Sequence, residues 1–282
     1  MARSLHIACL QTRPRPSMDS ALAEALPMAE AAVGAGAEML FLPEYCGGLA
    51  SDGVRFCPPT AQESEHPVLA AIRDFAAKRG VWVQVGSIAV EGPDDKIINR
   101  GYMIDGSGAV IGSYDKIHVF DVDLADGATY RESDTVSPGA CAQLYDTPFG
   151  KIGHTICYDL RFPGLFRDLA QAGAEILCCP AAFTKMTGEA HWHVLNRARA
   201  IENTAFVISA CAVGPVSGGG QSYGHSLVVN PWGDVLADGG TIAGVVHAQI
   251  DLDLAAQTSS RVPSLTHDRP YRLDAGEKRS VA

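Results

Sequence analysis

Residues 37–43 read AEMLFLP, and residues 174–180 read AEILCCP. Each stretch is almost continuously apolar, which is typical of a buried parallel strand. Both stretches follow the same Ala-Gly-Ala-Glu step, in which a glycine ends the preceding helix. Because one short pattern occurs twice in the same setting, the sequence predicts a chain built from two related halves.

The elements around the two stretches repeat in the same order. In the first half we expect a strand at 5–10, a helix at 19–33, a strand at 37–43, a helix at 67–79, a strand at 81–90 and a hairpin over 100–113. In the second half we expect a strand at 152–156, a helix at 164–173, a strand at 174–180, a helix at 189–203, a strand at 205–213 and a hairpin over 226–237. We therefore predict an α/β fold, a four-layer α-β-β-α sandwich built from two pseudo-repeated β-α-β-α-β-β units at about 5–115 and 151–250.

Three local expectations accompany this fold. Asp19 or Ser20 is a candidate N-cap of the first helix, and Pro27 should shorten or kink that helix. The stretch 215–220 is rich in Gly and Ser and is predicted to be a mobile loop. Residues 255–282 are polar and are predicted to form an extended tail. The chain 1–282 is then a single domain with its core at about 4–254.

Composition narrows the partners of the protein. The chain has 282 residues and 29.7 kDa, enough for a large core without stabilising cross-links. Its hydrophobic content is 47% and its formal net charge is −10, with no run of basic residues. Nucleic acid and anionic membrane surfaces are therefore not expected as partners.

Cysteine usage and the N-terminus predict a cytoplasmic protein. None of the eight cysteines forms a C-x-x-C pair, so the pattern favours reduced thiols. A strand begins at Leu5 without a preceding secretory pattern, and no apolar stretch approaches the ~18 residues of a membrane span. His191 and His193 should face different sides of a helix, and no carboxylate or thiol cluster is evident beside them. We therefore expect His191 and Trp192 to pack in the core and predict no metal site.

Three reactive side chains follow predicted strands. Glu44 comes directly after the strand at 37–43, Cys157 directly after the strand at 152–156, and Lys116 just past the last strand of the first unit. Functional groups of α/β sheets collect beyond the carboxyl ends of strands. A thiol, a carboxylate and an ammonium group together suit nucleophilic catalysis. Taken singly, each residue also fits an ordinary role, as a buried thiol, a loop carboxylate or a surface lysine.

The blocks that contain these residues resemble the nitrilase superfamily of carbon–nitrogen hydrolases. The matching blocks are LPE (42–44), YDKIH (114–118), RES (131–133), ICYDLRFP (156–163), TGEAHW (187–192), RARAIEN (197–203) and YGHS (223–226). The resemblance covers about residues 4–272. It is closest to the branch that holds omega-amidase and deaminated-glutathione amidase, which hydrolyses amides of small dicarboxylic acids without a cofactor.

The resemblance implies roles for four residues. Cys157 is expected to be the nucleophile, Glu44 the general base and Lys116 the stabiliser of the oxyanion, together with a backbone N–H such as that of Tyr158. Glu132 matches a second family glutamate that positions Lys116 and the substrate; its alternative is a surface pair with Arg131. The expected reaction releases ammonia or an amine through a thioester.

Four further residues are candidates for substrate binding: Tyr158, Arg161, Phe183 and Thr187. Arg161 could clamp a substrate carboxylate, or it could be a structural partner of Asp159. Phe183 could be core, and Thr187 could belong to a helix N-cap region. Residues 120–130 and 217–221 are expected to line or cover the pocket.

The resemblance leaves several functions open. The first is an amidase acting on a small-molecule amide, as a homodimer or larger homo-oligomer with exchanged C-terminal tails. The second is an N-carbamoyl amine hydrolase or nitrilase of the same fold. The third is a scaffold protein without catalysis, against which the presence of Glu44, Lys116 and Cys157 together argues.

Overall fold

The computed structural model describes residues 3–52, 55–124, 127 and 129–274. Its helices are α1 (Met18–Gly34), α2 (Pro67–Arg79), α3 (Pro163–Gln171), α4 (Lys185–Thr187), α5 (His193–Asn203) and α6 (Asp253–Arg261). Short 3-10 helices span Glu63–Glu65, Glu132–Asp134 and Cys157–Arg161, and a π-helical turn spans Gly188–Trp192. The predicted helix at 189–203 is therefore a π turn followed by α5.

The strands form two mixed sheets and two hairpins. The first sheet contains β1 (Ser4–Gln11), β2 (Met39–Phe41), β3 (Thr60–Ala61), β4 (Trp82–Glu91), β5 (Ile97–Ile104), β6 (Val110–Asp115) and β17 (Gly244–Asp251). The second contains β9 (Gln143–Thr147), β10 (Gly150–His154), β11 (Ile176–Cys178), β12 (Phe206–Ser209), β15 (Leu227–Val229) and β16 (Val235–Asp238). The hairpins pair β7 (Asp121–Asp123) with β8 (Thr129–Arg131) and β13 (Val213–Pro215) with β14 (Gln221–Tyr223).

The two sheets confirm the predicted repeat. The first runs β17-β1-β2-β4-β5-β6 and the second β9-β10-β11-β12-β15-β16, so three parallel strands are followed by two antiparallel ones in each. At matching places Glu38 N–H donates to the carbonyl of His6, and Glu175 N–H donates to the carbonyl of Lys151. The preceding glycines, at φ 95° and 101°, both adopt the left-handed conformation that glycine allows.

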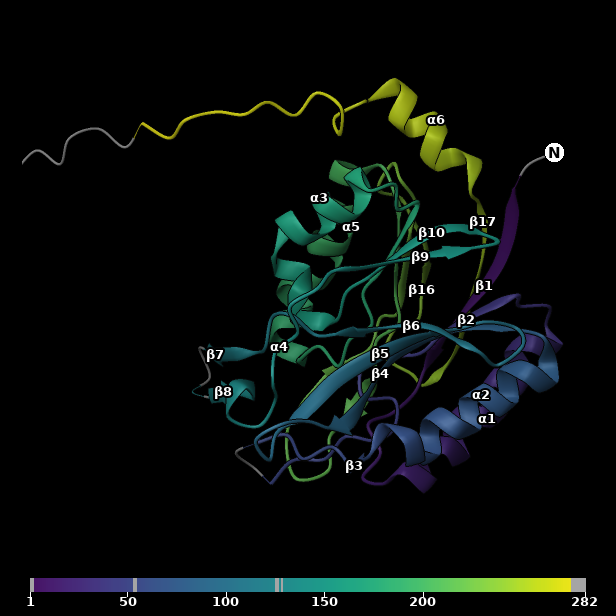
Figure 1. Ribbon diagram of the computed structural model, residues 1–282, viewed down its shortest axis with the longest axis vertical. Coiled ribbons are helices and arrows are strands. Elements are labelled where there is room, and N and C mark those ends of the chain that lie inside the picture. Colours follow the sequence, from purple (N-terminus) through teal and green to yellow (C-terminus); the bar gives the residue numbers. More distant parts are fainter. Residues whose placement is uncertain (1–2, 53–54, 125–126, 128, 275–282) are drawn as a thin grey trace, which may run out of the picture.

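Three apolar cores hold four layers together. One lies between α1 and α2 and the outer face of the first sheet, and another between α3 and α5 and the second sheet. The third joins the two sheets, with Ile7 and Phe41 on one side and Ile152 and Phe206 on the other. Figure 1 shows α1 and α2 on one flank, α3 and α5 on the opposite flank, and the strands between them. The predicted four-layer sandwich is confirmed.

Two expectations about the first helix are wrong. Its N-cap is Ser17, whose side chain accepts from Ser20 N–H, rather than Asp19 or Ser20. Pro27 does not shorten the helix, which continues through it to Gly34. Proline leaves the carbonyl four residues earlier without an intrahelical donor. Because Ala23 and Pro27 both lie on the exposed face, water can satisfy that carbonyl.

The structure places both predicted irregular segments and corrects the second. The stretch 215–220 closes the β13–β14 hairpin, and Ser51 N–H donates to the carbonyl of Ser217 at 2.7 Å, so this loop is tied to the first half. The predicted tail at 255–282 begins inside α6, which buries Ala255 and Thr258, while residues 275–282 lie outside the described part. Leu252 N–H donates to the carbonyl of Arg3, which holds the start of α6 beside β1.

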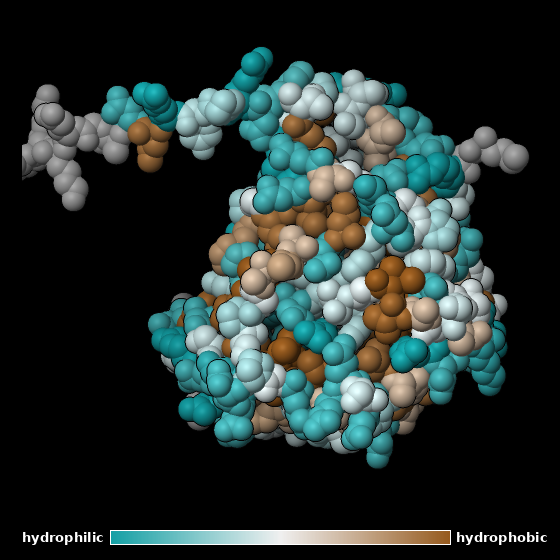
Figure 2. Space-filling model, viewed as in Figure 1, coloured by the Kyte–Doolittle hydropathy of each residue, from teal (hydrophilic) through white to brown (hydrophobic). Residues whose placement is uncertain are grey.

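One face of the described surface is mainly polar. Figure 2 shows polar side chains over most of one face, with apolar ones gathered in separate patches. After α6 the chain leaves the body, and Tyr271 and Leu273 are exposed (Figure 1). Among the described helices, none has the length and apolar character needed to cross a bilayer.

Candidate active site

Cys157 is held at a sharp bend beyond β10. It opens the 3-10 helix Cys157–Arg161 with φ 50°, a conformation that non-glycine residues rarely adopt. Its N–H donates to the carbonyl of Pro180 at 2.9 Å, which ties the bend to the end of β11. The next N–H, that of Tyr158, lies in the first turn, where backbone donors have no acceptor within the helix. Strain of this kind is typical of functional positions.

The side chain of Asp159 holds the bend at Cys157 in place through hydrogen bonds. Its carboxylate is fully buried and accepts from Ile156 N–H at 2.8 Å and from Tyr114 O–H at 2.7 Å. It also accepts from the backbone of His118 and contacts the Nδ1 of that ring at 2.7 Å. Arg161 is therefore not a partner of Asp159, so this alternative from the sequence is wrong; its place is taken by His118 from the YDKIH block.

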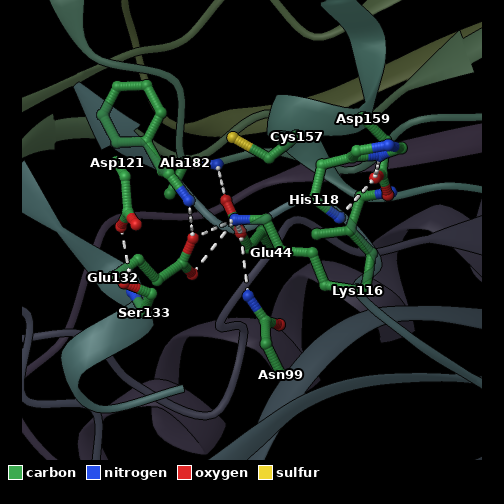
Figure 3. Close-up of polar contacts among 12 residues, drawn as sticks. Glu44, Asn99, Lys116, His118, Asp121, Glu132, Ser133, Cys157, Asp159 and Ala182 are labelled. Carbon is green, nitrogen blue, oxygen red and sulfur yellow. Dashed lines mark hydrogen bonds and ion pairs between the residues drawn. The ribbon is translucent and has the colours of Figure 1, made fainter. Parts of the chain in front are cut away.

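Glu44 lies opposite the sulfur of Cys157 (Figure 3). Its Oε1 accepts from Lys116 Nζ at 2.9 Å and from Asn99 Nδ2 at 3.0 Å. Its Oε2 accepts from Ala182 N–H at 2.8 Å. These donors come from both halves of the chain and leave Glu44 little freedom to turn away from the sulfur.

Lys116 lies between two glutamates (Figure 3). Besides its contact with Glu44, its Nζ contacts Glu132 Oε2 at 2.8 Å and Oε1 at 3.1 Å. Glu132 also accepts from Phe120 N–H at 2.5 Å and from Tyr45 O–H at 3.2 Å. The surface pair of Glu132 with Arg131 is therefore wrong, because Glu132 is buried and the Arg131 guanidinium pairs with Asp123.

Burial and charge set the protonation of the site. Burial, followed by the negative charge of Glu44, raises the pKa of Cys157 well above its usual value, although Lys116 opposes this. Burial alone would lower the pKa of Lys116, but the charges of Glu132 and Glu44 outweigh it and raise that pKa well above normal. At neutral pH the resting site therefore holds a neutral thiol beside a charged ammonium group.

A pocket opens onto this group, lined by Glu44, Tyr45, Leu49, Phe56, Lys116, Phe120, Glu132, Cys157, Tyr158, Ala182, Phe183, Thr184 and Thr187. Of the four predicted substrate-binding residues, Tyr158, Phe183 and Thr187 line it. Arg161 lies behind the wall, with its guanidinium carbon 5.5 Å from the Phe183 ring centre and 5.9 Å from that of Tyr158. Phe183 is both buried and pocket-lining. Thr187 occupies the N-cap position of the π turn, as its alternative expected, but its hydroxyl hydrogen-bonds to that of Thr184 and not to the backbone of the turn.

The loop predictions for the pocket are half right. Phe120 lines the pocket, whereas residues 125, 126 and 128 of the predicted segment lie outside the described part. The stretch 217–221 is not among the lining residues and contacts Ala50 and Ser51 instead.

Sequence reasoning missed four groups that hold the two glutamates. These are Tyr45 O–H, Asn99 Nδ2 and the N–H groups of Phe120 and Ala182. Tyr45 adjoins Glu44, and Ala182 follows the second apolar stretch, so their positions in the sequence could have indicated that they lie at the site. In the structure Tyr45 has φ 51°. Asn99 lies inside a strand, and nothing in its neighbourhood marks it.

The histidine prediction also needs correction. Trp192 is fully buried and donates its indole N–H to the carbonyl of His225 at 2.7 Å, as packing predicts. His191 is exposed and contacts Arg161 at 3.2 Å, so it is not packed in the core. His193 does meet a carboxylate, that of Asp238 at 3.0 Å, which comes from a strand far along the sequence.

Comparisons with known proteins agree in one family. The model described as "Carbon-nitrogen hydrolase" matches residues 6–260. Deaminated glutathione amidase of Yersinia enterocolitica is 42% identical over 212 residues, 74% of either chain, and that of Synechocystis is 37% identical over 92% of this chain and 96% of its own. The crystal structure of the C. elegans NitFhit protein superposes with a TM-score of 0.85 at 32% identity over 94% of this chain. This chain spans 65% of that longer protein.

Proposed function

The chain belongs to the carbon–nitrogen hydrolase family, within the nitrilase superfamily, and from this premise we propose that it hydrolyses the amide of a small carboxylic acid, of the deaminated-glutathione or omega-amide type, through a thioester on Cys157. Membership makes the chain an amidase-type enzyme. The relatives named deaminated glutathione amidase, at 37–42% identity, support the narrower substrate class.

In the proposed acylation, Cys157 attacks the amide carbon while its thiol proton moves to Glu44. A sulfur–carbon bond forms, and the carbonyl oxygen becomes an alkoxide. Lys116 and the N–H of Tyr158 donate to that oxygen, and one lost donor of this type costs about 3 kcal/mol of transition-state stabilisation. The carbon–nitrogen bond then breaks as Glu44 returns the proton to nitrogen, which releases ammonia or an amine and leaves the thioester.

In the proposed deacylation, Glu44 takes a proton from a water molecule that attacks the thioester. The new alkoxide uses the same donors. It collapses by breaking the carbon–sulfur bond, and the proton on Glu44 returns to the sulfur. The free acid leaves, and the site regains its neutral thiol and its ionised carboxylate. Glu132 does not touch the reacting atoms in this scheme and acts by positioning Lys116.

The observation that carries the proposal is the position of Lys116. Its ammonium group contacts Glu44 at 2.9 Å and Glu132 at 2.8 Å, and all three side chains are buried beside Cys157. A buried lysine that pairs with two carboxylates is costly to maintain for structure alone, because desolvation opposes the attraction. Stabilisation of a catalytic oxyanion would explain such an arrangement. The scaffold alternative does not explain it.

Ammonia release from a panel of substrates tests the proposal. The panel contains 2-oxoglutaramate, deaminated glutathione, a neutral aliphatic amide, an N-carbamoyl amino acid and a nitrile. We expect turnover to be fastest for the acid amides and to vanish in Cys157→Ala with an unchanged circular dichroism spectrum. Preference for the carbamoyl compound or the nitrile would reassign the substrate class, and turnover of none by folded protein would support the scaffold alternative.

The expected oligomeric state and cellular location are part of the same proposal. We propose a homodimer or larger homo-oligomer, which sedimentation would test. The cytoplasmic location is also proposed; it agrees with the eight free cysteines, of which six are buried. No cofactor has a place in the proposed chemistry.

A further inference from the structure

A second cluster of ligand-type side chains lies outside the pocket described above. His193 at the start of α5, His225 just before β15 and Asp238 at the end of β16 bring their donor atoms within 4.8 Å of one another. The three residues come from separate segments of the second half, and none lines the catalytic pocket. The cluster is partly open to solvent, with side-chain exposures of 35%, 21% and 34%.

The donor atoms converge on the Asp238 carboxylate. His193 Nε2 is 3.0 Å from Oδ2, and His225 Nδ1 is 2.8 Å from Oδ1 and 3.1 Å from Oδ2. In a tetrahedral site with bonds of about 2.0–2.1 Å, neighbouring ligand atoms are about 3.3 Å apart. Small side-chain shifts would therefore admit an ion between these three donors.

Hydrogen bonds fix the Asp238 carboxylate and the backbone beside the two histidines. Asp238 Oδ1 accepts from Gly240 N–H at 2.8 Å, and His225 N–H donates to the carbonyl of Gly240 at 2.7 Å. The carbonyl of His225 in turn accepts from the buried indole of Trp192, the residue before His193. A hydrogen bond that orients a ligating carboxylate, as Gly240 N–H does for Asp238, is typical of metal sites.

The ligand set indicates the kind of ion. Two imidazoles and one carboxylate suit Zn²⁺ and neighbouring divalent transition metals, whereas Ca²⁺ and Mg²⁺ prefer oxygen ligands alone. Three protein ligands leave a fourth position for water. An open hollow whose lining includes His225, Glu189 and Lys185 borders the cluster and offers that position a route to solvent.

We propose that His193, His225 and Asp238 form a binding site for a divalent transition metal ion such as Zn²⁺. The ion joins the start of α5, the segment before β15 and the end of β16. It lies next to the π turn Gly188–Trp192, which directly follows Thr187 of the pocket wall. Binding therefore stabilises the side of the second half that carries this wall.

Calorimetric titration of the full chain with ZnCl₂ in a non-chelating neutral buffer tests the site. The titration uses a Cys57→Ser/Cys141→Ser background, because these two thiols are exposed and cysteine thiolates are themselves ligands for zinc. We expect one ion per chain. Loss of orienting partners already weakens metal sites by about 10–100-fold, so His225→Ala or Asp238→Asn should weaken binding at least about 100-fold.

Two further variants separate metal binding from hydrogen bonding. His193→Gln keeps a donor for Asp238 but removes the imidazole ligand, so it should fold normally and still lose the ion. His191→Ala, two residues away and exposed, is the matched control and should bind like the background protein. Zinc should raise the thermal midpoint of the background and His191→Ala proteins only.

The outcomes are distinct. Binding that survives His193→Gln and Asp238→Asn, or the absence of binding to the background protein, would overturn the proposed site. Co²⁺ offers a second measurement, because a thiolate-to-metal charge-transfer band would place the ion on a cysteine and also overturn it. A Co²⁺ spectrum without that band, lost in His193→Gln, would support it.

Discussion

Replacing Lys116 with methionine removes the ammonium group that contacts both Glu44 and Glu132 while keeping a side chain of similar length. In the folded protein, the three contacts of 2.8, 2.9 and 3.1 Å disappear together. Two buried carboxylates then face each other without a countercharge. The substitution should therefore lower both the free energy of unfolding and kcat.

The size of each effect follows from the geometry. Removing one partner of a buried ion pair costs about 3–5 kcal/mol, because the other charge stays buried. In a domain of this size each kcal/mol shifts the melting temperature by about 2–4 °C, so we expect a fall on the order of 10 °C. Loss of one oxyanion donor lowers kcat by about 10²–10³-fold.

Thermal unfolding and ammonia release measure the two effects. Glu132 and Glu44 raise the pKa of Lys116 against the effect of burial, so its stabilising contribution is complete below the unfolded lysine pKa of about 10.4. It is lost only as pH rises through the higher pKa of the folded state. Measurements at neutral pH therefore report the whole loss. Lys78→Met, at an exposed lysine in the last turn of α2, is the control.

Two results would refute this reasoning. A Lys116→Met protein that melts within about 2 °C of Lys78→Met would show that the buried pair contributes no net stability, since about 3–5 kcal/mol would be missing. A folded variant with unchanged kcat would exclude Lys116 from the transition state. Loss of kcat together with an unfolded circular dichroism spectrum would call for Lys116→Arg, which keeps the charge and tests geometry alone.

Three further predictions concern the same pocket. Tyr45→Phe removes one donor to the Glu132 carboxylate, so the free energy of unfolding should fall by about 1.5–3 kcal/mol and kcat should drop with it; chemical denaturation showing no change would contradict the bond. Burial and Glu44 raise the pKa of Cys157, so its labelling by iodoacetamide, followed by mass spectrometry, should keep rising with pH beyond neutrality; a plateau below pH 7 would mean a thiolate at rest. If Arg161 binds a substrate carboxylate, Arg161→Lys should raise KM for an acid amide much more than for its neutral analogue. Equal changes in the two KM values would mean that Arg161 only packs against the Phe183 and Tyr158 rings.

Much of the fold is encoded in local patterns. The helix at 67–79 was predicted with its observed bounds, because its apolar positions fall on one face and Gly80 ends it in the left-handed conformation. Strands β9 and β17 were missed for different reasons. β9 lies between the two predicted units and forms a tight hairpin with β10, whereas β17 falls at the end of the second unit and pairs with β1, near the other end of the chain. Tertiary pairing, rather than local preference, forms β17.

The predicted catalytic residues could be identified from the sequence because each follows a strand. Glu44, Lys116 and Cys157 meet in the structure beyond the carboxyl ends of β2, β6 and β10, although β4 and β5 separate β2 from β6 and β10 belongs to the second sheet. The role of Asn99 could not be predicted from the sequence, because a single polar residue inside a strand gives no sign of which carboxylate it will reach across the sheet. Asp238 was missed for a related reason, since only the pairing of β15 with β16 brings it to His225.

The most direct test of the catalytic proposal is to trap the covalent intermediate. The protein is mixed with a substrate amide, quenched in acid within one turnover and analysed by peptide mass spectrometry. We expect the acyl mass on the peptide that contains Cys157 and its absence in Cys157→Ala. An acyl group on another residue, or ammonia release by Cys157→Ala at the wild-type rate, would contradict Cys157 as the nucleophile.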